Sequence, residues 1–166
     1  MNYKINKVQN VSRMCAVCGI ENAGGLKTRF FEIDCEGRPT LAGVPAALDV
    51  HQSYPNRMHG GLIGALLDET IGRAVQIRDE ALWGVTVELN LRYRKPVPLD
   101  APIVVLGFIT AETSRTFEGE GKIILPATGD VLAFATAKYV KLPPDRICGD
   151  DFLHTAWFPD TRPAPR

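Results

Sequence analysis

One acidic side chain stands out in residues 59–74, HGGLIGALLDETIGRA. At 100° per residue, the large apolar side chains of this segment cover more than half of a helix circumference, which predicts a largely buried helix. Asp68 falls in the remaining sector, between Gly64 and Gly72 one turn away on either side. It has no counter-ion on its own helix. A carboxylate in such a place is suited to act as a general base or as a nucleophile.

The two glycines beside Asp68 need a compensating gain, because each costs on the order of 1 kcal/mol relative to Ala in a helix interior. Close approach of a ligand or of another backbone would provide it. The structural alternative is a helix–sheet contact through this small face, with Asp68 hydrogen-bonded to a neighbour. Glu69 differs from Asp68, since Arg73 lies four residues later in the favourable orientation for an ion pair. We therefore expect Glu69 to be structural.

The start of this helix, His59, Gly60 and Gly61, offers a second chemical group. The first turn of a helix has N–H groups without intrahelical partners, and glycines leave them accessible to a ligand. Such groups stabilise an oxyanion or polarise a carbonyl, helped by the helix dipole. His59 is then expected either to orient a substrate or to cap the helix.

The four cysteines include one C-x-x-C pair, Cys15 and Cys18, while Cys35 and Cys148 stand alone. The paired knuckles of a zinc ribbon are absent. We favour free thiols or loop-packing residues, as is usual in a reducing compartment. The alternative is a zinc site, which requires a further ligand to converge on the pair, from Cys35, Cys148, His51, His59 or His154.

Alternating apolar and polar residues predict strands around the helix, at 26–37, 39–50, 84–96, 102–114, 116–126 and 130–143. Residues 51–58 are expected to form a loop. Residues 1–24 and the proline-rich tail 144–166 are expected to be irregular, which leaves one domain over 25–143. One long helix beside about five or six strands predicts an α+β fold, with an antiparallel sheet wrapped around the central helix. Such a sheet covers only part of the helix, so we expect a second subunit to cover the rest.

The composition limits the classes of partner. A chain of 166 residues suits one domain with a sizeable core. Lys and Arg total 19 and so do Asp and Glu, so no global positive charge indicates nucleic acid or an anionic membrane. The N-terminus lacks the apolar region of a signal peptide, and no run approaches the ~18 apolar residues of a membrane span. We therefore expect a cytoplasmic protein that binds neither nucleic acid nor membrane.

These residues and their order resemble the hotdog-fold acyl-CoA thioesterases of the phenylacetyl-CoA-pathway type. The main likeness is the His-Gly-Gly at 59–61, followed nine residues after the His by an acid on the same helix. GVTVELNLRYRKPVP is similar to the family's third strand, and CAVCGIENAGGLKTRF is similar to an N-terminal segment in one branch of the family. The resemblance covers roughly residues 15–142 and implies a hotdog fold.

The resemblance also implies roles for four residues. Asp68 would activate the attacking water or attack the thioester itself, and the Gly60 N–H would polarise the carbonyl. His59 would position the substrate, and Thr86 would hold the water or the acid. The alternation in 84–96 places Thr86 on the polar face of its strand, so it reaches Asp68 only if the strand bends or this face borders the cleft.

The candidates for substrate binding lie at and before the helix start: Gly61, Gln52, Ser53 and Asn56. Many members of the family have an Asn six residues before the His, where this chain has Ser53. The family uses a homodimer in which the glycine-bearing loop of one subunit meets the acid of the other, and some members form tetramers. We expect the same here, with no cofactor and no catalytic metal, because coenzyme A is part of the substrate.

Two other functions stay open at the level of the sequence. One is a hotdog hydratase or dehydratase, which would use a His–carboxylate pair on the acyl chain. The other is a non-catalytic protein that binds acyl-CoA or lipid and has kept the cleft. A thiol-release assay separates these from a thioesterase, because only the hydrolase frees coenzyme A.

Overall fold

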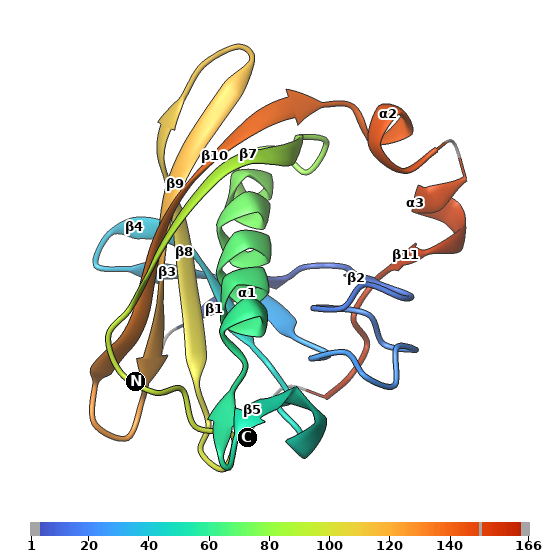
Figure 1. The fold of residues 1–166 in the computed structure, drawn as a ribbon. Coiled ribbons are helices and arrows are strands. Elements are labelled where there is room, and N and C mark those ends of the chain that lie inside the picture. The colour runs from blue at the N-terminus through green and yellow to red at the C-terminus, as the bar shows by residue number, and fades with distance from the viewer. Residues whose placement is uncertain (1–3, 150, 164–166) are drawn as a thin grey trace.

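The computed structural model describes residues 4–149 and 151–163, and its centre is the helix α1 (Gly60–Arg73). A seven-stranded antiparallel sheet wraps along one side of α1, while the C-terminal segment arcs past the other side (Figure 1). The strands, in their order across the sheet, are β1 (Ile5–Val8), β3 (Arg29–Cys35), β4 (Arg38–Val44), β8 (Val104–Glu112), β9 (Thr116–Leu125), β10 (Asp130–Leu142) and β7 (Trp83–Tyr93). The α+β architecture expected from the sequence is therefore confirmed, with seven strands in place of five or six.

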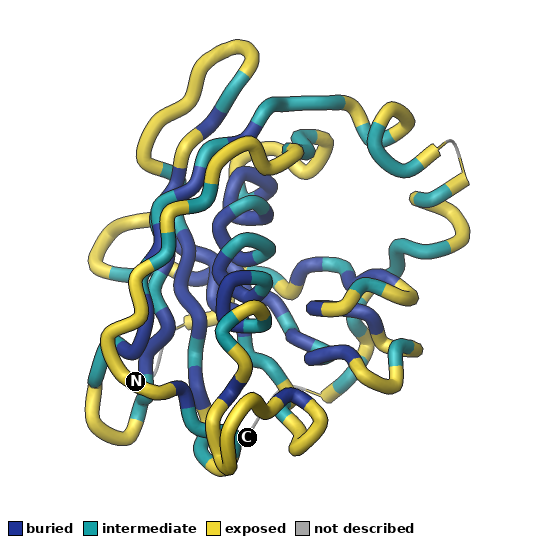
Figure 2. The backbone as a smooth tube through the Cα atoms, viewed as in Figure 1, coloured by how far each residue is buried: buried dark blue, intermediate teal, exposed yellow. Residues whose placement is uncertain are grey.

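The apolar face of α1 packs against the sheet as its periodicity predicts. Leu66, Leu67 and Ile71 are fully buried, and Figure 2 shows the continuous buried region along the helix and the central strands. After Arg73 the chain tightens into the short 3₁₀ helix η2 (Ala74–Ile77). Glycine in the sheet allows this close packing, since a Cβ at Gly119 would lie 2.6 Å from the Ile71 side chain. The core thus fixes both the position and the rotation of α1.

A β-bulge in β7 changes which side chains face the helix. Thr86 pairs with Tyr139 and Glu88 pairs with Lys138, so Val87 is an extra residue on β7. Beyond the bulge, Leu89 pairs with the inward-facing Ala137, whereas on the other side of it Thr86 faces inward. Strict alternation would have kept Thr86 on the outer face. The bulge is therefore the bend in β7 that Thr86 needs in order to face Asp68.

The expectation of an irregular N-terminal segment, 1–24, was wrong in part. Residues 5–8 form β1, an edge strand that pairs with β3 and brings the number of strands in the sheet to seven. Ile5 and Val8 are 44% and 36% exposed, so this edge strand has no buried face to give it an alternating pattern. Its pairing depends on the backbone of β3. A two-residue strand, β2 (Val11–Ser12), follows.

The tail 144–166 also contains regular elements where we expected none. Two short helices, α2 (Pro144–Cys148) and α3 (Phe152–Thr155), lead to β11 (Trp157–Phe158), which pairs with β2. Trp157 packs against Trp83 with ring centroids 5.0 Å apart. Asp160 then binds Arg29 of β3 through a contact of 2.8 Å. Contacts distant in sequence therefore hold this tail on the domain.

The expected loop at 51–58 contains a small hairpin. It follows a 3₁₀ turn, η1 (Asp49–His51), and consists of β5 (Gln52–Tyr54) and β6 (Arg57–Met58). Asn56 adopts φ 55° in the turn, a left-handed conformation that Asn tolerates better than most residues. The hairpin leads directly into the N-terminus of α1. Among the helices of the described residues, none has the length and apolarity needed to cross a bilayer.

Candidate active site

Two hydroxyl groups hold the Asp68 carboxylate. Thr86 donates from Oγ1 to Asp68 Oδ1 at 2.8 Å, and the Tyr139 hydroxyl approaches the same oxygen at 3.1 Å. The same hydroxyl donates to the Asp68 backbone oxygen at 2.8 Å, so its single hydrogen is shared between the two oxygens, and Tyr139 is only 2% exposed. Burial raises the pKa of Tyr139, and the Asp68 charge adds to this effect, so the phenol stays protonated as a donor. One carboxylate oxygen is thereby fixed.

The second carboxylate oxygen has no such partner in the described part of the chain. Asp68 is half-buried and lines a cavity of about 210 Å³ between α1, β7 and the C-terminal segment. Thr86, Tyr139, Gly72 and Trp83 line the same cavity. With Oδ1 held by hydroxyls, Oδ2 is the oxygen available to water or to an electrophile. The acid is thus oriented but not sealed within its own chain.

Of the two glycines beside Asp68, Gly72 brings a strand close to α1, whereas a Cβ at Gly64 would make only an ordinary contact. A Cβ at Gly64 would lie 3.5 Å from Leu91, and one at Gly72 would lie 3.0 Å from the Tyr139 ring. The helix–sheet contact that we considered as the structural alternative is therefore present. This helix–sheet contact also serves the site, because the close approach of Tyr139 to Gly72 brings its hydroxyl to Asp68 beside the cavity.

The N-terminus of α1 presents one unpaired amide. His59 is the N-cap, and its Nδ1 accepts a hydrogen bond from the Gly61 N–H at 3.0 Å. The Leu62 and Ile63 N–H groups donate to the His59 carbonyl. The Gly60 N–H meets no acceptor within 4–149 and 151–163. His59 thus caps the helix, and the capping leaves Gly60 as the donor available to a ligand.

Gly60 and Asp68 of one chain are too far apart to act on one carbonyl group. Asp68 follows Gly60 by eight positions on the same helix, which corresponds to about 12 Å along its axis. Tyr93 of β7 packs over the helix start and donates from its hydroxyl to the Gly60 oxygen at 2.9 Å. Tyr93 is nevertheless 57% exposed, so the region around Gly60 is open on the outside. A site that uses both groups needs two chains.

The loop candidates lie on the hairpin before α1. Gln52 and Ser53 are exposed on β5. Asn56 Oδ1 accepts hydrogen bonds from the Leu99 and Asp100 N–H groups at 3.0 and 3.1 Å, so this side chain ties the turn to the loop after β7. None of the three contacts Asp68 or Gly60 through a hydrogen bond among the described residues. Their role in substrate binding stays a prediction.

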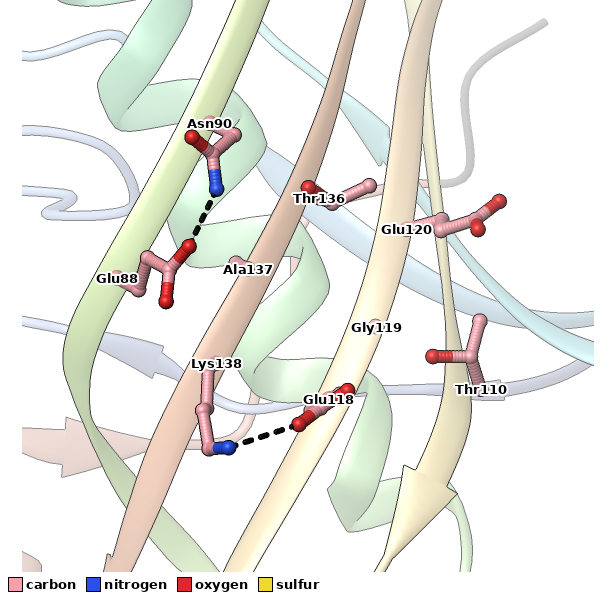
Figure 3. Close-up of a pocket in the computed structure, with 9 residues that line it drawn as sticks. All are labelled: Glu88, Asn90, Thr110, Glu118, Gly119, Glu120, Thr136, Ala137 and Lys138. Atoms are coloured by element: carbon pink, nitrogen blue, oxygen red, sulfur yellow. Dashed lines mark hydrogen bonds and ion pairs between the residues drawn. The ribbon is translucent and has the colours of Figure 1, made fainter.

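A second cavity, of about 220 Å³, lies on the opposite face of the sheet (Figure 3). Its polar lining includes three carboxylates, Glu88, Glu118 and Glu120, together with Lys138, which pairs with Glu118 at 3.0 Å. The sheet separates this cavity from Asp68. Its acidic lining repels the phosphates of a nucleotide-based substrate. We therefore place the candidate active site at Asp68 and leave this groove out of it.

Tyr139 is the site residue that the sequence analysis missed. It points inward from β10, on the same face of the strand as Ala133, Ala135 and Ala137. A tyrosine at the inward end of such a series has to find a partner for its hydroxyl, which was a usable signal. The identity of that partner depends on the contact between β10 and α1.

Comparison with known proteins agrees with this fold. Residues 56–129 match the family model described as "Thioesterase superfamily". Over 95 residues, 57% of this chain, the sequence is 30% identical to the acyl-coenzyme A thioesterase THEM4 of Mus musculus, and equally to that of Rattus norvegicus. The matched part spans 40% of the length of these relatives. The family-model match includes α1 and β7, which carry Asp68 and Thr86.

Solved structures give the same result for the fold. The crystal structure of a thioesterase superfamily protein aligns with a TM-score of 0.68 and 27% identity, covering 77% of this chain and 60% of that one. Thioesterase superfamily member 2 of the zebra fish aligns with a TM-score of 0.63 over 74% of this chain and 88% of its own. At 14% identity the latter is a likeness of fold alone. The chain therefore has the hotdog fold of solved thioesterase superfamily structures, and its residues 56–129 match the family model of that name.

Proposed function

We propose that this protein hydrolyses an acyl-CoA thioester to a free carboxylic acid and coenzyme A. The observation that carries the proposal is the Asp68 carboxylate, which two hydroxyls hold by one oxygen at the edge of a cavity. This arrangement orients the acid for chemistry at its second oxygen. The unpaired Gly60 N–H at a helix N-terminus supplies the second requirement of acyl transfer, a donor for the carbonyl oxygen.

The reaction needs no group beyond these. Asp68 removes a proton from water, the resulting hydroxide attacks the carbonyl carbon, and the electron pair moves to the carbonyl oxygen. The Gly60 N–H and the positive end of α1 stabilise that oxyanion. The C–S bond then breaks and the coenzyme A thiolate takes up the proton. In the nucleophilic variant Asp68 attacks directly, and water hydrolyses the resulting anhydride.

The catalytic unit in this proposal is a homodimer. β7 forms one edge of the sheet, has eleven residues, and pairs only with β10 among the residues that the structure describes. Val85 and Val87 on this edge are 40% and 57% exposed, as Figure 2 shows for much of the strand. A long, unpaired, partly apolar edge favours pairing with another chain. Pairing of β7 with its copy would close the sheet beside Thr86 and bring the second α1 near Asp68.

The hydratase alternative finds no His–carboxylate pair within the described residues of one chain. Such a reaction uses a His–carboxylate pair, and the histidines at 51, 59 and 154 make no hydrogen bond to Asp68 within the described part of the chain. His51 is buried and bonds to the Leu48 N–H and the Gly24 carbonyl, while His59 caps α1. The remaining alternative is a protein that binds acyl-CoA without hydrolysing it, and the assay below distinguishes it from a thioesterase.

The test is the change Asp68→Asn, assayed by thiol release with a panel of acyl-CoAs. We expect kcat to fall by at least about 100-fold, as for the loss of a general base, with affinity for a non-hydrolysable acyl-CoA analogue near that of the wild type. Asp79→Asn is the matched control, because Asp79 is an exposed acid beyond α1 whose contact is with the Ala81 N–H.

Two results would contradict the proposal. Wild-type turnover by Asp68→Asn would remove the assigned acid. Saturable binding of acyl-CoAs by the wild type, without any release of coenzyme A across the panel, would show a binding protein instead.

A further inference from the structure

The C-x-x-C turn meets the central helix at the residue next to Asp68. The Cys15 and Cys18 sulfur atoms and a carboxylate oxygen of Glu69 all lie within 4.8 Å of one another. Cys15 Sγ is 3.8 Å from Glu69 Oε2. Cys18 is buried, and Cys15 and Glu69 are half-buried. Two thiols and a carboxylate, all of which are ligand types of Zn²⁺, thus converge from two separate segments.

We propose that Cys15, Cys18 and Glu69 bind one Zn²⁺ ion, and this proposal is independent of the thioesterase activity. Tetrahedral Zn²⁺ has Zn–S distances of ~2.3 Å and Zn–O distances of ~2.0–2.2 Å, which set the sulfur–oxygen separation at about 3.6 Å. The 3.8 Å between Cys15 Sγ and Glu69 Oε2 is close to this value. The other two separations lie within 4.8 Å, so the ligand atoms have to approach by no more than about 1 Å to complete the three bonds.

The turn that carries the cysteines is already shaped for a metal-bound thiolate. The Val17 and Cys18 N–H groups donate to Cys15 Sγ at 3.2 and 3.4 Å. Gly19 closes the turn with a hydrogen bond to the Cys15 oxygen, and a Cβ at Gly19 would lie 2.4 Å from that oxygen. Backbone N–H groups around a sulfur atom stabilise its negative charge. The same groups orient the sulfur toward Glu69.

The charge around the cluster also suits a divalent cation. Glu69 Oε1 lies 3.9 Å from Arg73 Nη1, which is the ion pair expected from the sequence, while Oε2 is the oxygen that faces Cys15. Arg73 is 6% exposed, and its Nε and Nη1 have no hydrogen-bond acceptor among the residues that the structure describes. Two thiolates, one carboxylate, one Zn²⁺ and one guanidinium sum to zero. A neutral cluster avoids leaving a net charge buried.

The third ligand differs from those that the sequence analysis considered for a zinc site. The third ligand is Glu69, whereas none of the cysteines and histidines considered for that place joins the pair in the described part of the chain. All three ligand residues line a cavity of about 340 Å³, which Met14, Trp83 and Trp157 also line. Water can therefore complete the tetrahedron. The ion would tie the N-terminal turn to α1 beside the catalytic acid.

The experiment is a metal titration of the full chain. The protein is reduced, stripped with a chelator, and titrated with Zn²⁺ against a chromophoric chelator, with Co²⁺ as a spectroscopic substitute. We expect one ion per chain, release of the two thiol protons, thiolate-to-cobalt absorption in the near ultraviolet, and a rise in Tm with the metal.

Variants locate the site. Cys15→Ser and Cys18→Ser should each lower Zn²⁺ affinity by more than the ~10–100-fold that loss of an outer-shell partner costs, with a smaller loss for Glu69→Gln. Cys148→Ser is the matched control, because Cys148 lies in α2 outside the cluster. Circular dichroism checks that each variant is folded.

Three outcomes would overturn the proposal. The first is that the reduced wild type, folded by circular dichroism, binds no stoichiometric Zn²⁺ at micromolar concentration. The second is that Cys148→Ser weakens binding as much as the cluster variants do. The third is that Co²⁺ binds without thiolate absorption, which would place the ion elsewhere. These results would leave the thiol-release assay with Asp68→Asn unchanged.

Discussion

A mixture of two inactive variants tests whether the active site is shared between chains. One variant is Asp68→Asn, which removes the acid. The other is Gly60→Pro, which removes the N–H of the helix start and adds the proline ring. Proline suits this position, because Gly60 is the first helical residue, its φ is negative, and His59 has φ −62° and ψ 134°, a conformation allowed before proline. A Cβ at Gly60 would approach only the tip of the exposed Tyr93 side chain.

The expected magnitudes follow from the geometry. Gly60→Pro alone should lower kcat by about 10²–10³-fold, as for the loss of one oxyanion donor. About 12 Å separates Gly60 from Asp68 within one chain, so each site should draw them from different chains. A mixed dimer of the two variants then has one intact site and one site with both lesions. Random mixing makes half of the dimers mixed, which restores about a quarter of wild-type activity.

The assay is thiol release after the two variants are unfolded and refolded together, compared with each variant refolded alone. Gly60→Ala is the control for the proline, because it adds a Cβ and keeps the N–H, and it should retain most of the activity. Mixed protein no more active than the sum of its components, although light scattering shows a dimer, would refute a site built from Asp68 of one chain and Gly60 of the other. A monomer that turns over at the wild-type rate would refute it as well.

Two further changes test the support of the site and of the tail. Thr86→Val removes the hydroxyl that donates to Asp68 Oδ1 without changing the size of the side chain. We expect kcat to fall by roughly 10–100-fold, because a hydrogen bond to a charged group contributes ~1.5–3 kcal/mol. An unchanged kcat would show that Tyr139 alone positions the acid. Asp160→Asn should lower the free energy of unfolding by roughly 3 kcal/mol at neutral pH, because Asp160 is a buried partner of Arg29 and Arg162. Burial opposes ionisation of Asp160, but the hydrogen bonds from Arg162 and Arg29 outweigh it and lower the pKa of this carboxyl. Its stabilisation is therefore complete above the ordinary Asp pKa of about 4 and is lost as the pH falls through the lowered value, so urea denaturation curves of wild type and variant should converge in acid. A constant difference between the two at all pH values would contradict this linkage.

Local patterns were sufficient for the central helix and most of the sheet. The large apolar face of α1, its polar sector and its glycine-rich start follow from side-chain spacing along one segment, and these are the features that the core and the N-cap preserve. The strands β8, β9 and β10 likewise follow from alternation and short turns. The short edge strand β1 does not, because its side chains are largely exposed and its partner, β3, begins more than twenty residues later.

The sequence by itself determined that one carboxylate sits on the small face of a buried helix whose first N–H groups have no intrahelical partner. Only the tertiary structure decided what surrounds it: the bulge at Val87 turns Thr86 inward, Tyr139 reaches Asp68 from β10, and the C-x-x-C turn meets Glu69. These depend on strand register and on contacts between segments distant in sequence. Helix periodicity and capping are properties of neighbouring residues, whereas register and convergence exist only once the chain has packed.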